Sequence, residues 1–190
     1  MSEDDGTGQD GGETAVVLDI LPHGRADDDR PQYEKEPLGY ALDSDRFILY
    51  ELTLATADVS IGDRLDIYDS QVVRRASQID YEELSSGARS ELDYVIEDLI
   101  EANEAEFVDI YNSAGPISLR LHQLNLLPGI GKKLRNDILD ERKRRGPFES
   151  FDDLESRIDG LHNPREILIE RIMEELREDD LKYRLFARED

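Results

Sequence analysis

The stretch Leu127-Pro128-Gly129-Ile130-Gly131-Lys132-Lys133-Leu134 lies between two segments whose apolar residues recur at helical spacing. Pro128 is incompatible with a helix interior and should end the first segment. Glycine adopts backbone conformations that are closed to other residues, so Gly129 and Gly131 predict a sharp turn. Ile130 should be the apolar residue that joins the two helices. The stretch therefore predicts two helices connected by a short hairpin.

The helix that starts after this hairpin should attract anions. Its first N–H groups have no partner within the helix and lie at the positive end of the helix dipole. Lys132 and Lys133 stand in the first turn, where a cation is unfavourable for the dipole, so an external phosphate explains them better than helix stability does. The candidate nucleic-acid-binding residues are Gly129, Ile130, Gly131, Lys132, Lys133, Arg135, Arg142, Lys143, Arg144 and Arg145.

A purely structural interpretation competes with this one. The glycines could form a turn that only packs two helices, an arrangement that also serves protein contacts. Residues 142–145 fall at a helix C-terminus, where the dipole favours cations, and this accounts for part of the basic cluster. It does not account for Lys132 and Lys133.

The distribution of charge restricts where a polyanion could bind. The chain of 190 residues has 46 acidic and 23 basic residues, a net charge of -23. Residues 128–146 carry +4, whereas residues 76–112 carry -10. Any nucleic-acid contact should therefore be confined to the 128–146 surface. Abundant acids with only five lysines resemble the proteins of salt-accumulating, halophilic archaea, and molar salt would screen the self-repulsion.

The pattern before the hairpin predicts a small β-barrel. Short apolar runs predict strands at 15–21, 38–42, 47–54, 64–68 and 107–111, and residues 90–104 have the spacing of an amphipathic helix inserted before the last strand. Residues 22–37 should form a long exposed loop. Tyr40, Phe47 and Tyr50 could stack on bases, but aromatic residues in strands more often belong to the core, which we favour.

The C-terminal part should be helical, with helices at 117–126, 131–144, 150–158 and 164–178. A second hairpin at 158–164 keeps one glycine and lacks the Gly-x-Gly, so it should bind phosphate less well than the first. After the last helix, residues 181–190 should form a strand or tail that docks on the rest of the protein.

These elements define an α+β fold: a disordered acidic tail at 1–13, an OB-like β-barrel with a helical insertion at 14–112, and an all-α tandem helix-hairpin-helix domain at 113–180. The hairpin at 127–134, followed by residues 146–154 where the connector should be, resembles tandem helix-hairpin-helix proteins. Over residues 14–186 the chain resembles an archaeal domain-of-unknown-function family. That resemblance implies nucleotide or RNA binding and names no substrate.

Several other functions have little support in the sequence. The absence of cysteine excludes disulfides and thiolate metal sites. His23, His122 and His162 lack metal-ligand spacing, and carboxylate pairs such as Asp43 with Asp45 or Asp152 with Asp153 are expected by chance among 46 acids, so we expect no metal and no cofactor. Without a signal peptide or long apolar segment, a cytoplasmic protein with no membrane contact is expected.

The sequence thus favours a non-catalytic protein that binds the phosphate backbone of RNA or DNA through residues 128–133. The barrel would offer a possible second surface for a single strand. Two alternatives stay open: a protein-interaction module of a nucleic-acid-processing complex, which would use the acidic 80–106 region or the tail, and a metal-dependent nuclease.

Overall fold

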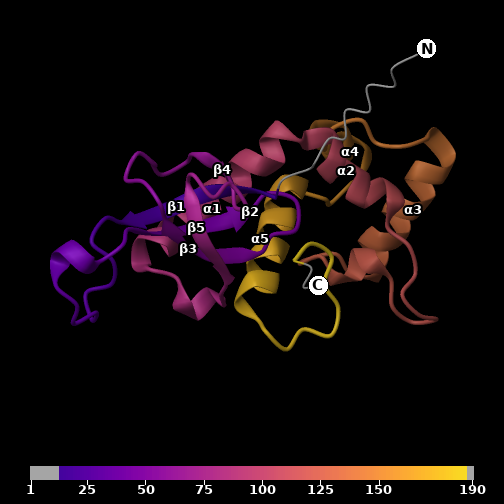
Figure 1. The fold of residues 1–190 in the computed structure, drawn as a ribbon. Helices are drawn as coiled ribbons and strands as arrows, with labels where there is room; N and C mark the ends of the chain where they lie inside the picture. The colour runs from indigo at the N-terminus through magenta and orange to yellow at the C-terminus, as the bar shows by residue number, and fades with distance from the viewer. Residues whose placement is uncertain (1–12, 188–190) are drawn as a thin grey trace, which may run out of the picture.

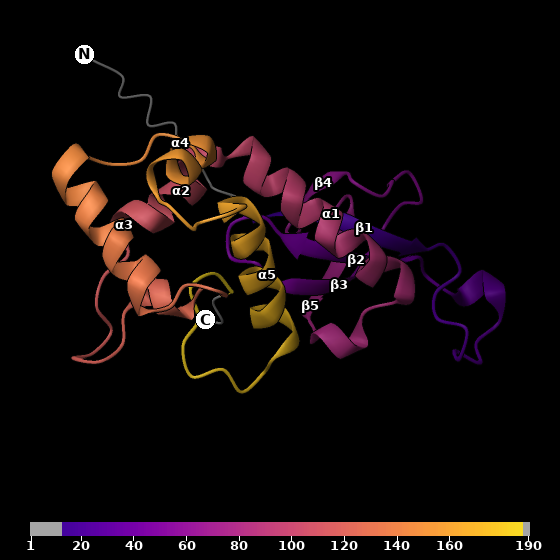
Figure 2. The same ribbon diagram turned by 180° about the vertical axis from the view of Figure 1, so that it is seen from behind.

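The computed structural model describes residues 13–187 of the chain. The predicted acidic tail at 1–13 lies outside these residues except for Glu13. In Figure 1 the β-sheet occupies one end of the molecule and α3 (Lys132–Arg145) the other, with α5 (Pro164–Arg177) between them. Figure 2 shows the same order from behind, with α1 (Ser86–Ala102) lying along the sheet.

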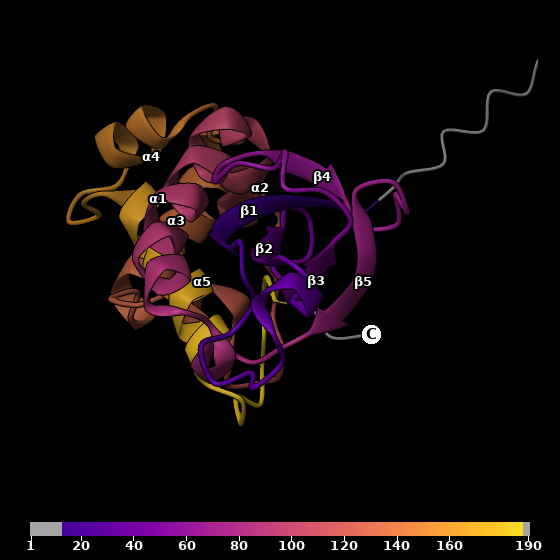
Figure 3. The ribbon, with the colours of Figure 1, turned by 60° about the vertical axis from the view of Figure 1, so that its left-hand side comes forward.

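The sheet is antiparallel and strongly curled. Its strands are β1 (Thr14–Leu21), β2 (Leu38–Asp43), β3 (Leu49–Leu54), β4 (Arg64–Asp66) and β5 (Val73–Gln78). They lie in the order β4-β1-β2-β3-β5, and Figure 3 shows them curving around one side of the molecule as a half-barrel. The predicted strands at 15–21, 38–42, 47–54 and 64–68 are confirmed at β1 to β4.

Both faces of the sheet are covered, which explains its apolar strands. On β1, Val16 and Leu18 pack toward the helices, while Ala15 and Val17 face a separate apolar cluster inside the curl. A strand buried on both faces reads as a continuous apolar run instead of alternating with polar residues. The aromatic side chains Tyr40, Phe47 and Tyr50 are also buried, so the prediction that they belong to the core is confirmed.

The helices continue the same core. α1 is followed by α2 (Glu104–Ser113), a 3₁₀ helix at Gln123–Leu126, α3, α4 (Phe151–Arg157) and α5. One cluster of buried residues extends from Val16 in β1 through Leu92 in α1 to Ile138 in α3. The predicted helices at 90–104, 131–144, 150–158 and 164–178 are confirmed at α1, α3, α4 and α5.

The prediction of a strand at 107–111 was wrong, because these residues lie in α2. Phe107, Val108 and Tyr111 are its buried residues, and that spacing fits one face of a helix. The fifth strand is β5, where Arg74 and Arg75 are exposed. Charged side chains are common on an edge strand, and here they interrupt the apolar alternation that the prediction relied on.

The predicted helix at 117–126 was also wrong over most of its length. Only Gln123–Leu126 is helical, and the preceding residues form a loop closed by a β-bridge between Pro116 and His122. The Ser118 hydroxyl accepts hydrogen bonds from the backbone N–H groups of Arg120 and Leu121, at 3.3 and 3.1 Å. Such local side-chain bonds offer the backbone an alternative to the helix.

The C-terminal segment docks as predicted, although residues 181–187 contain no strand. The buried Glu175 carboxylate accepts hydrogen bonds from the N–H groups of Leu185, Phe186 and Ala187, at 2.6 to 2.9 Å. The Phe186 ring lies 6.2 Å from that of Phe47 and 6.4 Å from that of Phe107. The segment thereby joins the sheet to α2 and α5.

Candidate nucleic-acid interface

The two glycines of the first turn have different structural roles. Gly129 has φ +76°, a left-handed conformation that favours glycine. Gly131 has φ -85° and ψ -171° and is the N-cap of α3, a conformation open to any residue. Between them, Ile130 is only 4% exposed, as expected for the apolar residue of the hairpin, and its N–H donates to the Leu127 carbonyl at 3.2 Å. The backbone therefore requires glycine at 129 and does not require it at 131.

The space around the turn is open. A Cβ atom added to Gly129 or Gly131 would meet no heavy atom within 4 Å, and both residues are exposed. Neither the backbone conformation nor the packing of the described residues explains glycine at 131. A residue without a side chain at this N-cap leaves the start of α3 accessible to a ligand.

Backbone donors are available at the same place. Among residues 13–187 the N–H groups of Lys132, Lys133 and Leu134 have no acceptor, and no side chain caps the helix. The first N–H of α3 that is satisfied belongs to Arg135, which donates to the Gly131 carbonyl at 3.0 Å. Together with the helix dipole, these donors can bind an oxyanion.

Asn125 holds the turn in this conformation, and sequence analysis did not identify it. Its side-chain amide donates to the Ile130 carbonyl at 3.1 Å and its oxygen accepts a hydrogen bond from Arg135 at 2.9 Å. Arg135 also donates to the side-chain oxygen of Asn136 at 3.2 Å. Arg135 is thus partly occupied in supporting the turn. No sequence signal marks Asn125, because its partners follow from the folded turn.

The two lysines of the first turn differ in their surroundings. Lys133 forms an ion pair with Asp137 at 2.8 Å, and this hydrogen bond raises the pKa of the Lys133 ammonium. Lys132 is exposed and has no acidic partner among residues 13–187. Lys132 is therefore the cation most available to a phosphate at this turn.

The downstream basic residues do not form one uniform surface. Arg142 is half-buried and donates to the carbonyls of Tyr111 at 2.9 Å and Ala114 at 2.8 Å, and its burial lowers its pKa. Arg145 pairs with Glu141 at 2.9 Å. Lys143 and Arg144 are exposed, and neither has an ion-pair partner within the described part of the chain. The predicted set therefore comes together along α3, but Arg142 points inward.

The second turn repeats the backbone of the first with one open N–H fewer at the start of its helix. Gly160 has φ +84°, and the buried Leu161 donates its N–H to the Ile158 carbonyl at 3.3 Å. The following helix, however, is preceded by Asn163 with φ +50° and begins at Pro164, which has no N–H. This arrangement supports the expectation that the second turn binds phosphate less well.

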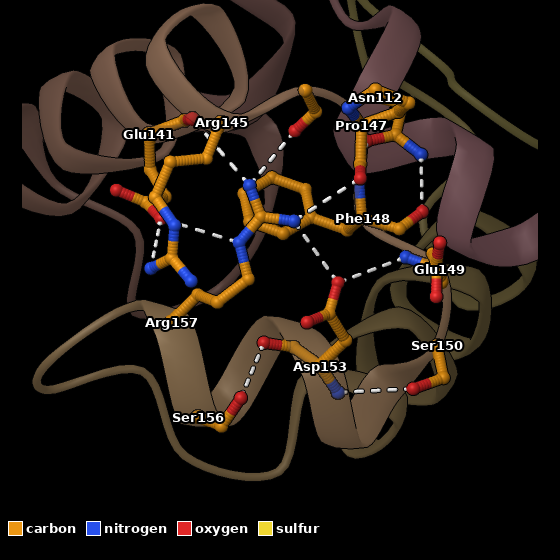
Figure 4. Close-up of polar contacts among 11 residues, drawn as sticks. Asn112, Glu141, Arg145, Pro147, Phe148, Glu149, Ser150, Asp153, Ser156 and Arg157 are labelled. Atoms are coloured by element: carbon orange, nitrogen blue, oxygen red, sulfur yellow. Dashed lines mark hydrogen bonds and ion pairs between the residues drawn. The ribbon is translucent and has the colours of Figure 1, made fainter.

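A buried arginine fixes the connection between the two turns (Figure 4). Arg157 lies 4.4 Å above the Phe148 ring, and its guanidinium donates to the carbonyls of Gly146 and Pro147 and to the carboxylates of Glu141 and Asp153. Asn112 in α2 bonds to both the N–H and the carbonyl of Phe148, at 2.8 and 2.9 Å. The connector is therefore tied to α2, α3 and α4.

An acidic groove of about 790 Å³ lies on the other side of the first turn. Residues 125–131 form one wall, and the other holds Glu170, Arg171, Glu174 and Arg177 of α5 together with Glu178 at the helix C-cap. Arg171 pairs with Glu174 at 2.9 Å. The three glutamates and two arginines of that wall sum to -1, whereas residues 128–146 carry +4, so this side attracts anions less than the α3 side does.

Residues 13–187 contain no candidate metal centre and no candidate transmembrane helix. These residues contain no group of three or more histidine and acidic side chains placed to hold a metal ion. His122 is buried, and its Nδ1 accepts a hydrogen bond from the N–H of Leu124 at 3.1 Å. Burial, followed by the charges of Arg142 and Arg135, lowers its pKa. No helix of the described residues is long and apolar enough to cross a bilayer.

A curled five-stranded antiparallel sheet followed by two helical turns of matching backbone defines a mixed α+β protein. The chain belongs to the family described as "Protein of unknown function (DUF655)", whose model matches residues 12–188. This confirms the predicted archaeal domain-of-unknown-function family.

Two relatives cover most of the chain. It is 39% identical over 181 residues to "Uncharacterized protein MJ0038" of Methanocaldococcus jannaschii. The aligned region covers 92% of this chain and 79% of that protein. It also resembles the crystal structure of Af1531 from Archaeoglobus fulgidus, with a TM-score of 0.83 and 38% identity over 93% of this chain and 99% of that one. The solved structure therefore supports the fold over nearly the whole chain.

Proposed function

We propose that this protein binds nucleic acid without catalysis, holding the phosphate backbone at the turn formed by residues 128–133. In this proposal the two turns form a tandem helix-hairpin-helix unit and the curled sheet is an OB-like barrel. The protein would act in the cytoplasm. The nucleic acid would lie along α3, away from the carboxylates of α5.

The observation that carries the proposal is the open start of α3. Gly131 has an ordinary backbone conformation and no neighbour within 4 Å of its missing Cβ, so the fold itself does not require glycine there. Close approach of a ligand to the N–H groups behind it does require the absence of a side chain. Lys132 supplies a positive charge at the same place.

The buried aromatic residues favour the turn over the sheet as the main contact. Tyr40 and Phe47 are each 3% exposed, so neither can stack on a base in this structure. The turn instead offers donors that are already oriented and need no rearrangement.

The experiment is a binding titration of the full chain at molar KCl with single-stranded RNA, duplex RNA and duplex DNA. We expect binding to at least one of them and a weaker complex for Lys132→Gln. Glu170→Gln, which removes a charge from the acidic groove, should bind at least as well as the unchanged protein. Failure of all three nucleic acids to bind would overturn the proposal.

A further inference from the structure

The most exposed large apolar side chain of residues 13–187 belongs to Leu119, at 106% relative exposure. It lies in the connection between α2 and α3, which Figures 1 and 2 show leaving the helices as a projecting loop. The other strongly exposed large apolar residues include Tyr33, Tyr68 and Tyr94, whose hydroxyl groups can meet water. Leucine has no such group, so its exposed surface is available to an apolar partner.

The loop that carries Leu119 is held in one conformation by its own hydrogen bonds. The N–H groups of Ile117 and Ser118 both donate to the Leu121 carbonyl, at 2.8 and 3.0 Å, and Pro116 pairs with His122. At the base of the loop, the N–H of Gly115 donates to the side chain of Gln123 at 2.8 Å. A loop closed in this way cannot readily turn Leu119 inward.

The loop is also fixed relative to the candidate phosphate-binding turn. Arg142 of α3 donates to the Ala114 carbonyl at 2.8 Å, which attaches the start of the loop to the helix that carries Lys132. Between His122 and Leu127 runs only the 3₁₀ helix Gln123–Leu126. At about 2 Å per residue, the base of the loop lies about 10 Å from the turn, or about three nucleotides of one strand.

The charge around Leu119 suits a nucleic acid. Arg120 is the one charged residue in the stretch 113–127, if histidine is counted as neutral, and the next stretch, 128–146, carries +4. In a chain of net charge -23, Leu119 thus lies in a stretch, 113–127, that has no acidic residue. An apolar side chain flanked by a cation can contact bases while the cation contacts a neighbouring phosphate.

We propose that Leu119 is an apolar wedge that contacts and partly unstacks the bases of a nucleic acid whose phosphate backbone is held at the turn 128–133. This rests on the proposed function. Arg120 neutralises one phosphate beside the wedge. The substrate class is a nucleic acid with a base step that opens easily, such as a mismatched or flexible step.

The test compares Leu119→Ser, Leu119→Met and Ile61→Ser in titrations against a mismatched duplex carrying 2-aminopurine beside the mismatch, as DNA and as RNA. Ile61 is a matched control, because it is an exposed aliphatic residue, at 52%, in the connection between β3 and β4. Leu119→Ser should raise the Kd about tenfold, whereas Leu119→Met and Ile61→Ser should bind like the unchanged protein. 2-Aminopurine brightens when it loses stacking, and only Leu119→Ser should abolish that increase.

The salt dependence separates the wedge from the phosphate contacts. A side chain that neutralises no phosphate leaves the slope of log K against log salt unchanged, so Leu119→Ser should give a parallel line. Arg120→Gln should make the slope shallower by about 0.9. The proposal for Leu119 is wrong if Leu119→Ser binds as well as the unchanged protein, or if its complex still shows the fluorescence increase. The proposed function is unaffected by either outcome. If the unchanged protein binds neither form of this duplex, the proposal for Leu119 is overturned as well. Failure also of the three nucleic acids named above would overturn the proposed function.

Discussion

The Arg142 guanidinium donates to the carbonyl of Ala114 at 2.8 Å, just beyond the C-terminal end of α2. A second donor of the same group reaches the Tyr111 carbonyl at 2.9 Å. Carbonyls at the end of a helix have no partner within it, so Arg142 satisfies groups that α2 itself leaves open. An arginine predicted to face a nucleic acid thus joins α3 to α2.

We therefore predict that Arg142→Gln lowers the free energy of unfolding by about 1–3 kcal/mol, because it leaves half-buried carbonyls without donors. Arg144→Gln is the control, since Arg144 is exposed on the same helix and should change stability by less than about 0.5 kcal/mol. Urea denaturation at a fixed KCl concentration measures both. Equal stability of the two variants would show that the contacts of Arg142 contribute nothing.

A second prediction concerns the buried carboxylate of Glu175, which is 1% exposed. It accepts a hydrogen bond from Arg171 at 2.8 Å as well as from three N–H groups of the C-terminal segment. Glu175→Ala should cost about 3–5 kcal/mol, because it leaves the Arg171 cation buried without its main partner. Glu174→Ala, at a more exposed position, should cost no more than about 1 kcal/mol.

Denaturation of these two variants, together with a chain lacking residues 181–190, would check this prediction. The truncated chain should also be destabilised, because it loses the contacts of the Phe186 ring with Phe47 and Phe107. Unchanged stability of the truncated chain would mean that the docked segment does not hold the sheet and helices together.

The regular elements could be predicted where one periodicity was clear. The helix α3 lies between Gly131 and Gly146, α5 has a long apolar pattern that begins after Pro164, and residues 15–18 of β1 are an uninterrupted apolar run. The stretch 107–111 was too short to distinguish a strand from a helix. In β5, the edge residues Arg74 and Arg75 concealed the pattern.

The candidate site could be predicted only in part, because some of its contacts are local in the sequence and others join residues that are far apart in it. The turn at 128–133 depends on glycine, proline and a helix start, which are all visible along the chain. The inward direction of Arg142 depends on Ala114, which lies 28 positions away in the sequence. The support from Asn125 arises only once the turn has formed. Contacts of this kind follow from packing and leave no local pattern.

A third prediction separates the two lysines of the first turn by salt dependence. Lys132→Gln should make the slope of log K against log salt shallower by about 0.9 on duplex DNA. Lys133→Gln should have a smaller effect, because Lys133 is already paired with Asp137. If the two lysines supplied all the phosphate contacts, raising KCl from about 0.15 to about 3 M would weaken binding by roughly two decades. Titrations across this range measure the slopes, and a larger effect for Lys133→Gln would contradict the assignment.

The central claim is that binding depends on the open start of α3 and not on the general positive charge of that helix. Gly131→Val tests this directly, because its backbone conformation accepts valine and an added Cβ meets no heavy atom within 4 Å. Ser86→Val, at the exposed start of α1, controls for an added apolar side chain. The double variant Arg144→Gln with Arg145→Gln controls for charge.

The decisive measurement is the affinity of these three variants and the unchanged protein for one oligonucleotide at about 3 M KCl, where the charge contribution is strongly screened. We predict that Gly131→Val stays folded, with a cost of no more than about 2 kcal/mol for the poorer N-cap, and loses binding at least tenfold, about 1.4 kcal/mol. Ser86→Val should bind normally, and the double arginine variant should weaken binding only modestly. Equal losses for Gly131→Val and the double arginine variant, or normal binding by Gly131→Val, would contradict the account.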